Sequence, residues 1–157
     1  MNKKIFVRAE EGKPPGISVV YYDSDGNKTI RYHEKNGKEG SHAWRNNNPG
    51  NLKSGDVSKR NNQIGKAGGF AIFPDYSTGH AALLDCLRTT YKNATLEFLI
   101  SKFAPAFEND TKNYLRFLVK KIGVTKDHKV KDLSLEQFEK LWRAMNKTSL
   151  RSKSCLC

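Results

Sequence analysis

The sequence predicts an α+β protein with a small β unit at its amino terminus and a mainly helical carboxyl-terminal part. Two observations predict this class. Residues 4–33 are rich in β-branched and aromatic residues and are interrupted by turn-forming Gly, Pro and Asp. Beyond residue 76, apolar residues recur instead with the spacing of helices that bury one face. The 157 residues suffice for one domain with its own core, or for a domain with a short appendage.

Three strands are expected in the β unit. Residues 5–7 form a short apolar run, residues 17–22 are β-branched and aromatic, and residues 29–33 resume that pattern. Asp25 followed by Gly26, between the last two runs, is a typical hairpin turn. Residues 34–42 are polar and Gly-rich, which predicts a linker.

A polar loop region and four helices are predicted to follow. Residues 43–69 contain so much Asn and Gly that they are expected to form a loop, and a short strand is expected at 69–73. The caps expected for the first three helices are, in order, Ser77 or Thr78, Thr95, and Asn109 or Asp110. Gly123 is the expected stop of the third helix. In the fourth, Ser134 and Gln137 have the spacing of a capping box. Its apolar stripe comprises Leu135, Phe138, Leu141, Trp142 and Met145.

The composition gives a formal net charge of +12, from 28 Lys and Arg against 16 Asp and Glu. Such a chain is attracted to polyanions, which include nucleic acid, anionic membranes and anionic cell walls. The charge is +6 in residues 1–69 and +6 in residues 70–157, so no basic arm for nucleic acid stands out. A hydrophobic fraction of 37% excludes a plain disordered tail, and no apolar run reaches the length of a membrane span.

Cysteine and histidine usage predicts neither a disulfide framework nor a metal site, and no cofactor is expected. Cys86 lies in an apolar helical run and is expected to be a buried thiol. Cys155 and Cys157 end the chain in a basic tail. The four histidines are scattered, and none has ligand spacing to another His or to a Cys. No signal-peptide-like stretch follows Met1, so the chain is expected to be made in the cytoplasm without a cleavable signal.

An asparagine cluster is the sharpest functional signal. Its members are Asn46, Asn47, Asn48 and Asn51. Their amides both donate and accept hydrogen bonds, as recognition of sugar hydroxyl and N-acetyl groups requires. Trp44 offers a face on which a sugar ring can stack, and Arg45 adds a charge. The alternative is a structural turn in which the Asn side chains bond to the backbone around Pro49 and Gly50.

A second functional signal comes from acidic residues that could serve as a catalytic acid. Glu108 and Asp110 stand at the start of the predicted third helix, where they can simply stabilise its positive end. Alternatively, Glu108 is an acid at the lip of a cleft, with Pro105 and Phe107 building the apolar pocket that raises a carboxyl pKa. Glu39, just before the Asn cluster, is a rival acid, as is Glu34.

Several blocks in a fixed order carry a resemblance. They are residues 43–52 (AWRNNNPGNL), residues 64–75 (IGKAGGFAIFPD), Gly79 with residues 82–83, and residues 103–111 (FAPAFENDT) with Tyr114. This series, within residues 41–124, resembles a bacterial and phage family related to the virion-associated lytic protein of cystovirus-type phages. The resemblance implies a lysozyme-like fold and peptidoglycan degradation. It divides the chain into a β-rich extension (1–40), a lysozyme-like domain (41–147) and a basic tail (148–157).

The resemblance implies a peptidoglycan hydrolase of lytic-transglycosylase or muramidase type, with endopeptidase activity as a further option. Glu108 is the first candidate for the catalytic acid and Glu39 the second. In lysozyme-like enzymes this glutamate ends a helix, whereas residues 29–40 are predicted here as strand and linker. The residues expected to contact the glycan are Trp44, Arg45, Asn48, Asn51 and Tyr114.

This interpretation also implies where the protein acts and with what. Peptidoglycan is the expected substrate, reached through lysis or through delivery by a phage particle or a secretion apparatus, and an immunity protein is a further possible partner. Two alternatives stay open. The chain can be a non-catalytic wall-binding or virion structural module on the same scaffold, or a non-specific nucleic-acid binder, which the even charge distribution disfavours.

Overall fold

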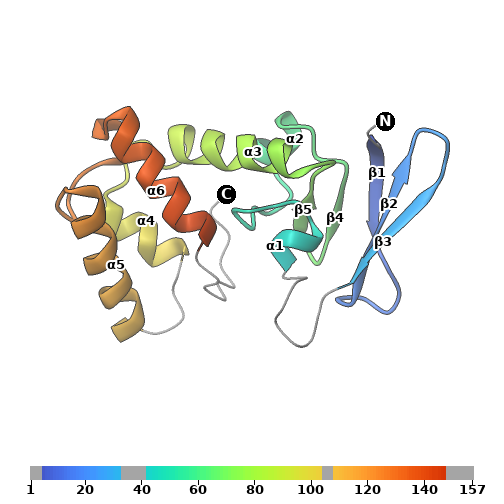
Figure 1. Ribbon diagram of the computed structural model, residues 1–157, viewed down its shortest axis with the longest axis horizontal. Coiled ribbons are helices and arrows are strands. Elements are labelled where there is room, and N and C mark those ends of the chain that lie inside the picture. Colours follow the sequence, from blue (N-terminus) through green and yellow to red (C-terminus); the bar gives the residue numbers. More distant parts are fainter. Residues whose placement is uncertain (1–4, 33–41, 104–107, 148–157) are drawn as a thin grey trace. The chain divides into compact units, whose positions relative to one another are not determined.

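The computed structural model describes residues 5–32, 42–103 and 108–147 (Figure 1). Helices and small antiparallel sheets are both present, which confirms the α+β class. The chain divides into two compact units between Leu83 and Leu84, inside helix α3 (Tyr76–Thr89). The first unit, residues 1–83, contains both described sheets, and the named elements of the second unit, residues 84–156, are all helices.

The predicted hairpin and a third strand form the sheet nearest the amino terminus. Strands β1 (Phe6–Glu11), β2 (Ser18–Asp23) and β3 (Lys28–Tyr32) are antiparallel in the order β1-β2-β3. At the β2–β3 turn, a carboxylate oxygen of Asp23 accepts the N–H groups of Asp25 and Asn27, both at 2.9 Å. Gly26 adopts a φ of 82°, which confirms why a glycine stands there.

This sheet shares its core with the segment that follows it. Strands β4 (Gly65–Ala67) and β5 (Phe70–Ile72) form a second hairpin. The N–H of Ala9 in β1 donates to the carbonyl of Ile64 at 3.0 Å. The shared core comprises Ala9, Val19, Tyr21, Ala67 and Ile72. A three-stranded sheet buries its apolar face only against another element, and here that element is the β4–β5 hairpin.

Residues 43–69 are more regular than expected. They include most of the short helix α1 (His42–Arg45), as well as α2 (Asp56–Arg60) and β4. Elements of three to five residues are too short to show a hydrophobic period, so the turn-forming composition of this segment hides them in the sequence.

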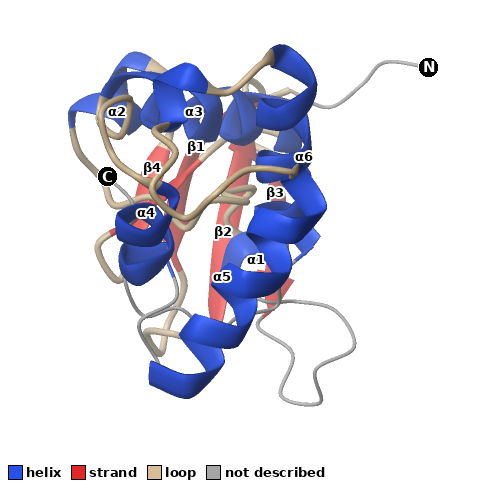
Figure 2. Ribbon diagram, turned by 90° about the vertical axis from the view of Figure 1, so that its left-hand side faces the viewer, coloured by secondary structure: helices blue, strands red, loops and turns tan. Residues whose placement is uncertain are grey.

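The second unit contains the carboxyl-terminal half of α3, then α4 (Leu96–Phe103), α5 (Glu108–Ile122), a 3-10 turn (Val130–Asp132) and α6 (Leu135–Lys147) (Figure 2). Helix α5 packs against both α4 and α6. Fully buried side chains of this unit include Leu87, Leu96, Leu99, Ile100, Leu118 and Leu141.

The helix boundaries test the predicted caps. Thr95 caps α4, because its hydroxyl accepts the N–H of Phe98 at 3.1 Å. For α3, Ser77 and Thr78 were the wrong residues: the helix begins at Tyr76, and the Asp75 carboxylate accepts the N–H of Thr78 at 2.7 Å. Helix α5 begins at Glu108, before both residues expected to cap it.

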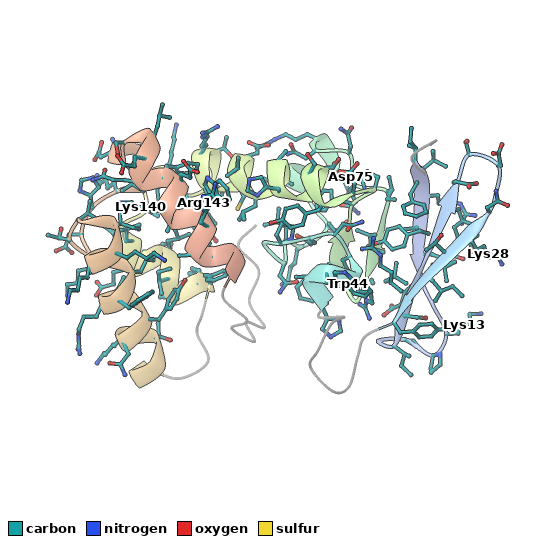
Figure 3. All side chains as sticks on the ribbon, in the orientation of Figure 1. Lys13, Lys28, Trp44, Asp75, Lys140 and Arg143 are labelled. Atoms are coloured by element: carbon teal, nitrogen blue, oxygen red, sulfur yellow. The ribbon has the colours of Figure 1, made fainter. Side chains whose placement is uncertain are left out.

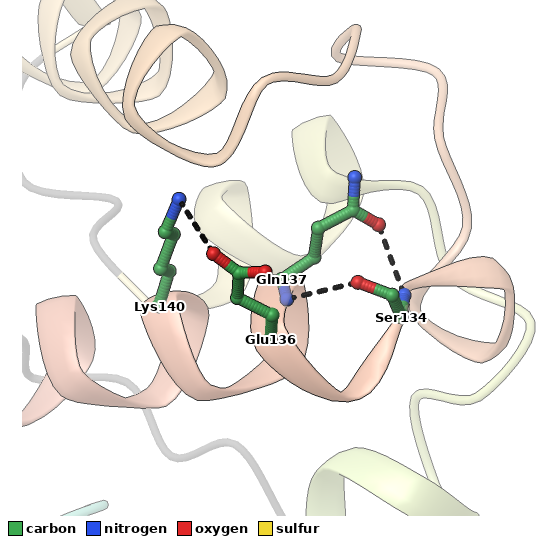
Figure 4. A network of polar contacts seen from close by, with 4 residues as sticks. All are labelled: Ser134, Glu136, Gln137 and Lys140. Atoms are coloured by element: carbon green, nitrogen blue, oxygen red, sulfur yellow. Dashed lines mark hydrogen bonds and ion pairs between the residues drawn. The ribbon is translucent and has the colours of Figure 1, made fainter.

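At the other end of α5, Gly123 has a φ of 85° and donates to the Val119 carbonyl, as expected of a helix stop. The capping box of α6 is confirmed (Figure 4). The N–H of Ser134 donates to the Gln137 side chain at 2.9 Å, and the N–H of Gln137 donates to the Ser134 hydroxyl at 3.1 Å. Leu135 does not join the apolar stripe of α6. It is 84% exposed, because the first residue of the helix lies beyond the surface that Phe138, Leu141 and Met145 bury.

Cys86 differs from expectation. It is fully buried, as its apolar helical run predicts, but it is disulfide-bonded and not a free thiol. Helical periodicity indicates burial, whereas covalent pairing depends on the tertiary structure. Cys155 and Cys157 lie outside the described residues. Among the helices of the described ranges, none has the length and apolar character needed to cross a membrane.

Candidate functional site

The asparagine-rich segment, residues 43–52, is an ordered turn that we call the Asn loop. Its backbone folds back on itself, since the N–H of Asn48 donates to the Ala43 carbonyl at 2.8 Å and that of Asn51 to the Asn48 carbonyl at 3.0 Å. Asn47 and Asn51 have φ angles of 52° and 48°. Among side chains other than glycine, Asn tolerates this left-handed conformation best. Two of the asparagines are therefore accounted for by backbone geometry.

Asn48 joins the Asn loop to strand β5. Its side chain is fully buried and makes three hydrogen bonds. The amide nitrogen donates to the carbonyls of Leu52 (2.9 Å) and Ala71 (3.0 Å), and the amide oxygen accepts the N–H of Leu52 at 2.9 Å. Direct contact between this side chain and a glycan requires the loop to open, because its amide is used inside the protein.

Asn47 extends the same attachment to the residue after β5. Its amide nitrogen donates to the Phe73 carbonyl at 3.1 Å, while its oxygen accepts a guanidinium N–H of Arg31 at 2.9 Å. The same nitrogen of Arg31 also lies 3.0 Å from the Trp44 carbonyl, to which it donates. Strand β3, which carries Arg31, and the segment after β5 thus hold the loop from two directions.

Arg45 is an internal charge, with only 2% of its surface exposed. Its guanidinium donates to the Gly16 carbonyl at 3.0 Å and to the Asn46 side chain at 3.2 Å. Burial lowers the pKa of Arg45, and the opposing attraction of Glu11 and Tyr21 does not cancel that effect. Burial likewise raises the pKa of Tyr21, whose neutral hydroxyl donates to the Arg45 carbonyl. Arg45 therefore holds the loop to the β2 region.

Trp44 is the predicted glycan contact that the structure leaves at the surface (Figure 3). It is 44% exposed, and the guanidinium carbon of Arg31 lies 5.0 Å from the centroid of its ring. An aromatic face beside a fixed cation suits a ligand that combines a ring with a carboxylate. Because the Trp44 carbonyl is also bonded to Arg31, the position of this pair is fixed by the loop.

Two buried polar atoms of the Asn loop have no hydrogen-bond partner among the described residues. They are the amide nitrogen of Asn46, a donor, and the amide oxygen of Asn51, an acceptor. Buried polar groups in folded proteins are nearly always paired with protein, water or a ligand. Asn46 and Asn51 therefore each have one buried polar atom that no described protein atom pairs with.

The predicted catalytic acids are not placed by the structure. Glu39 lies outside the described residues, and for Glu108 only the backbone, at the start of α5, is described. Tyr114 is on α5 in the second unit and is partly buried. In the first unit, Glu11 accepts the N–H of Gly16 at 2.9 Å and Asp75 caps α3, so these two carboxylates have structural tasks.

The chain is similar to a phage protein. Protein P5 of Pseudoalteromonas phage PM2 is 32% identical to it over 101 residues, which make up 60% of this chain and 63% of the phage protein. The alignment thus spans less than two thirds of the length of that relative. No family model matches the sequence, and no solved structure matches the fold.

Arg31 is the residue that sequence reasoning missed. It contacts Trp44 and Asn47, yet it precedes Trp44 by 13 positions and stands in a strand whose pattern indicates only a half-buried sheet. The antiparallel pairing of β3 with β2 brings it to the Asn loop. An alternating strand shows which positions share a face but not which loop that face meets.

Proposed function

We propose that this protein is a peptidoglycan hydrolase with a lysozyme-like fold, of lytic-transglycosylase or muramidase type, whose Asn loop presents Trp44 to the glycan. The observation that carries the proposal is the exposed Trp44 ring beside Arg31, on a loop held in place by buried hydrogen bonds. A sugar ring stacks on an aromatic face, and Arg31 can pair with a carboxylate of the wall polymer.

Rigidity of the loop supports binding. Side chains that are already ordered lose little conformational entropy when a ligand binds, so more of the contact energy contributes to affinity. In this proposal Asn48 and Arg45 do not contact the glycan but hold the loop in place through buried hydrogen bonds. The side-chain amide oxygen of Asn51 has no hydrogen-bond donor among the described residues.

Cleavage of a glycosidic bond needs a protonated carboxyl beside the leaving oxygen. Glu108 is the first candidate for this acid and Glu39 the second, from the resemblance described above. The net charge of +12 supports a wall target, because a basic enzyme is concentrated near an anionic polymer. Similarity to a phage protein supports delivery with a phage particle or by lysis.

Activity on purified peptidoglycan sacculi tests the enzyme proposal. Wild type is expected to release soluble fragments, and either Glu108→Gln or Glu39→Gln is expected to lower the rate by about 100-fold or more, since the variant lacks the proton donor. Mass spectrometry of the fragments distinguishes anhydro-sugar ends, reducing ends and cleaved peptides. Absence of release by wild type rejects the enzyme, and full activity in both variants moves the acid elsewhere.

Trp44→Ala tests the proposed glycan contact. We expect its KM for soluble glycan to rise about 10-fold with a smaller change in kcat, because stacking binds substrate and transition state alike. Trp44→Phe is the matched control and should retain most of the affinity. Equal KM values for wild type and Trp44→Ala, with both proteins folded by circular dichroism, would remove Trp44 from the site.

A second candidate is a non-catalytic wall-binding or virion structural module. The structural tasks of Glu11 and Asp75 favour it, because these carboxylates of the first unit are bonded to backbone groups. This candidate predicts that the protein sediments with sacculi and releases no fragment, and that Trp44→Ala reduces the sedimented fraction.

A further inference from the structure

Helix α5 carries a row of positively charged residues between residue 112 and its last turn. Residues 111–122 include four Lys and Arg and no Asp or Glu. The exposed residues of this segment, which we call the α5 cationic face, are Lys112, Asn113, Arg116, Phe117, Lys120 and Lys121. The opposite side of the helix, with Leu115, Leu118 and Ile122, is buried.

Helical geometry orders the α5 cationic face into two rows. Lys112, Arg116 and Lys120 follow one another at four-residue intervals, which separates their positions by about 6 Å along the helix axis. Phe117 belongs to the adjacent row, is 57% exposed, and has the ammonium nitrogen of Lys121 5.7 Å from its ring centroid. A line of cations therefore runs beside an exposed aromatic ring.

Acids on the neighbouring elements are paired with other cations. Glu97 of α4 lies 3.4 Å from Lys126. On α6, Glu136 lies 3.6 Å from Lys140 (Figure 4), and Glu139 lies 2.7 Å from Arg143. Within the described residues, Arg116, Lys120 and Lys121 form no ion pair. Arg116, Lys120 and Lys121 thus keep their positive charge, unlike Lys140 and Arg143 on α6.

We propose that the α5 cationic face binds single-stranded nucleic acid. Sites for single strands combine a positive track for the phosphates with an aromatic ring on which a base stacks. Here Lys112, Arg116 and Lys120 form the track, and Phe117 is the stacking ring once the Lys121 side chain turns aside. A single strand has a flexible backbone, so its phosphates can adjust to the spacing of the cations.

Other polyanions fit this face less well. In a duplex the base faces are stacked and paired, so Phe117 has no base to meet. A membrane-surface helix inserts its apolar side into the lipid, but Leu115, Leu118 and Ile122 are already buried in the protein.

The test is binding of a fluorescently labelled oligothymidylate, measured by anisotropy over a range of NaCl concentrations. The triple variant Lys112→Gln/Arg116→Gln/Lys120→Gln is expected to bind at least 10-fold more weakly at low salt. Its slope of log affinity against log salt should fall by about 2, since each phosphate contact on a single strand contributes about 0.7. The matched control, Lys53→Gln/Lys59→Gln/Lys66→Gln, removes the same charge from exposed positions of the first unit and should change affinity much less.

Phe117→Ala is expected to weaken binding about 10-fold without changing the salt slope, and Phe117→Trp to restore it. Equal losses in the two triple variants, or no effect of Phe117→Ala in a protein that melts like wild type, would overturn the proposal. Tighter binding of a duplex, or face-dependent capture by anionic vesicles or sacculi without oligonucleotide binding, would also overturn it. Because the assay contains no peptidoglycan, its outcome is independent of the proposed hydrolase activity.

Discussion

Replacing Asn48 by alanine is expected to lower the free energy of unfolding of the first unit by about 2–4 kcal/mol. The change removes three buried hydrogen bonds at once and leaves the N–H of Leu52 without its acceptor. For a chain of this length the melting temperature should fall by about 5–15 °C. Thermal and urea unfolding, followed by circular dichroism and tryptophan fluorescence, measure the effect.

Asn93→Ala is the control for Asn48→Ala, since Asn93 is exposed and its replacement should shift stability by less than about 0.5 kcal/mol. If Asn48→Ala melts with wild type, the buried side chain does not fix the loop. In that event Asn48 becomes available again as a direct contact for the glycan, as its residue type first indicated.

A second large effect is expected from Gly79→Ala in helix α3. A Cβ atom at this position would lie 1.8 Å from the carbonyl oxygen of Asn47 and 3.1 Å from the Phe73 ring. The helix or the Asn loop must therefore move, and overpacking of this kind costs about 1–3 kcal/mol or more. The sign of the stability change is informative, because helix propensity alone predicts that replacing glycine by alanine inside a helix stabilises it by about 1 kcal/mol.

Gly55→Ala is the matched control for Gly79→Ala. No atom lies within 4 Å of the position that its Cβ would take, and its φ of −171° is extended backbone that any residue adopts. We expect little change in melting temperature for Gly55→Ala and a clear decrease for Gly79→Ala. A Gly79→Ala protein that is as stable as wild type would show that α3 does not press against the Asn loop.

Both variants bear on function, because the Asn loop presents Trp44. A loop loosened by Asn48→Ala or Gly79→Ala should also raise the KM for glycan, even though neither residue is proposed to touch the substrate. Stability and binding are thus expected to change together in these two variants, whereas Trp44→Ala should change binding with little effect on stability, since its ring is half exposed.

Several structural features that depend on neighbouring residues were predicted correctly from the sequence. Asp25-Gly26 at the hairpin, Thr95 and Ser134 as caps, and Gly123 as a helix stop all stand where the sequence placed them. In each case the interacting groups are separated by five residues or fewer, so a short stretch of sequence contains the whole interaction. The α+β class follows from the same signals, because strands and helices were recognised by their own periods.

Tertiary structure decided which partners the asparagine side chains of the Asn loop have. The composition of the loop allowed either sugar recognition or a structural turn, and the partners of Asn47 and Asn48 on and next to β5 lie 23 to 26 residues away. Burial of Arg45 beneath β2 and the approach of Arg31 to Trp44 depend on strand pairing in the same way. A short stretch of sequence cannot reveal contacts between residues that lie this far apart in the chain.

The charge of the protein also depends partly on its sequence and partly on its tertiary structure. The sequence by itself determined a net charge of +12, spread evenly between its halves, and the periodic positions of residues 112–121. Only the tertiary structure decided that the apolar side of α5 is buried and that Glu97 of α4 pairs with Lys126, which follows α5 in the chain. The physical reason is that composition fixes how many charges a chain carries, whereas packing against distant segments fixes which of them remain together at the surface.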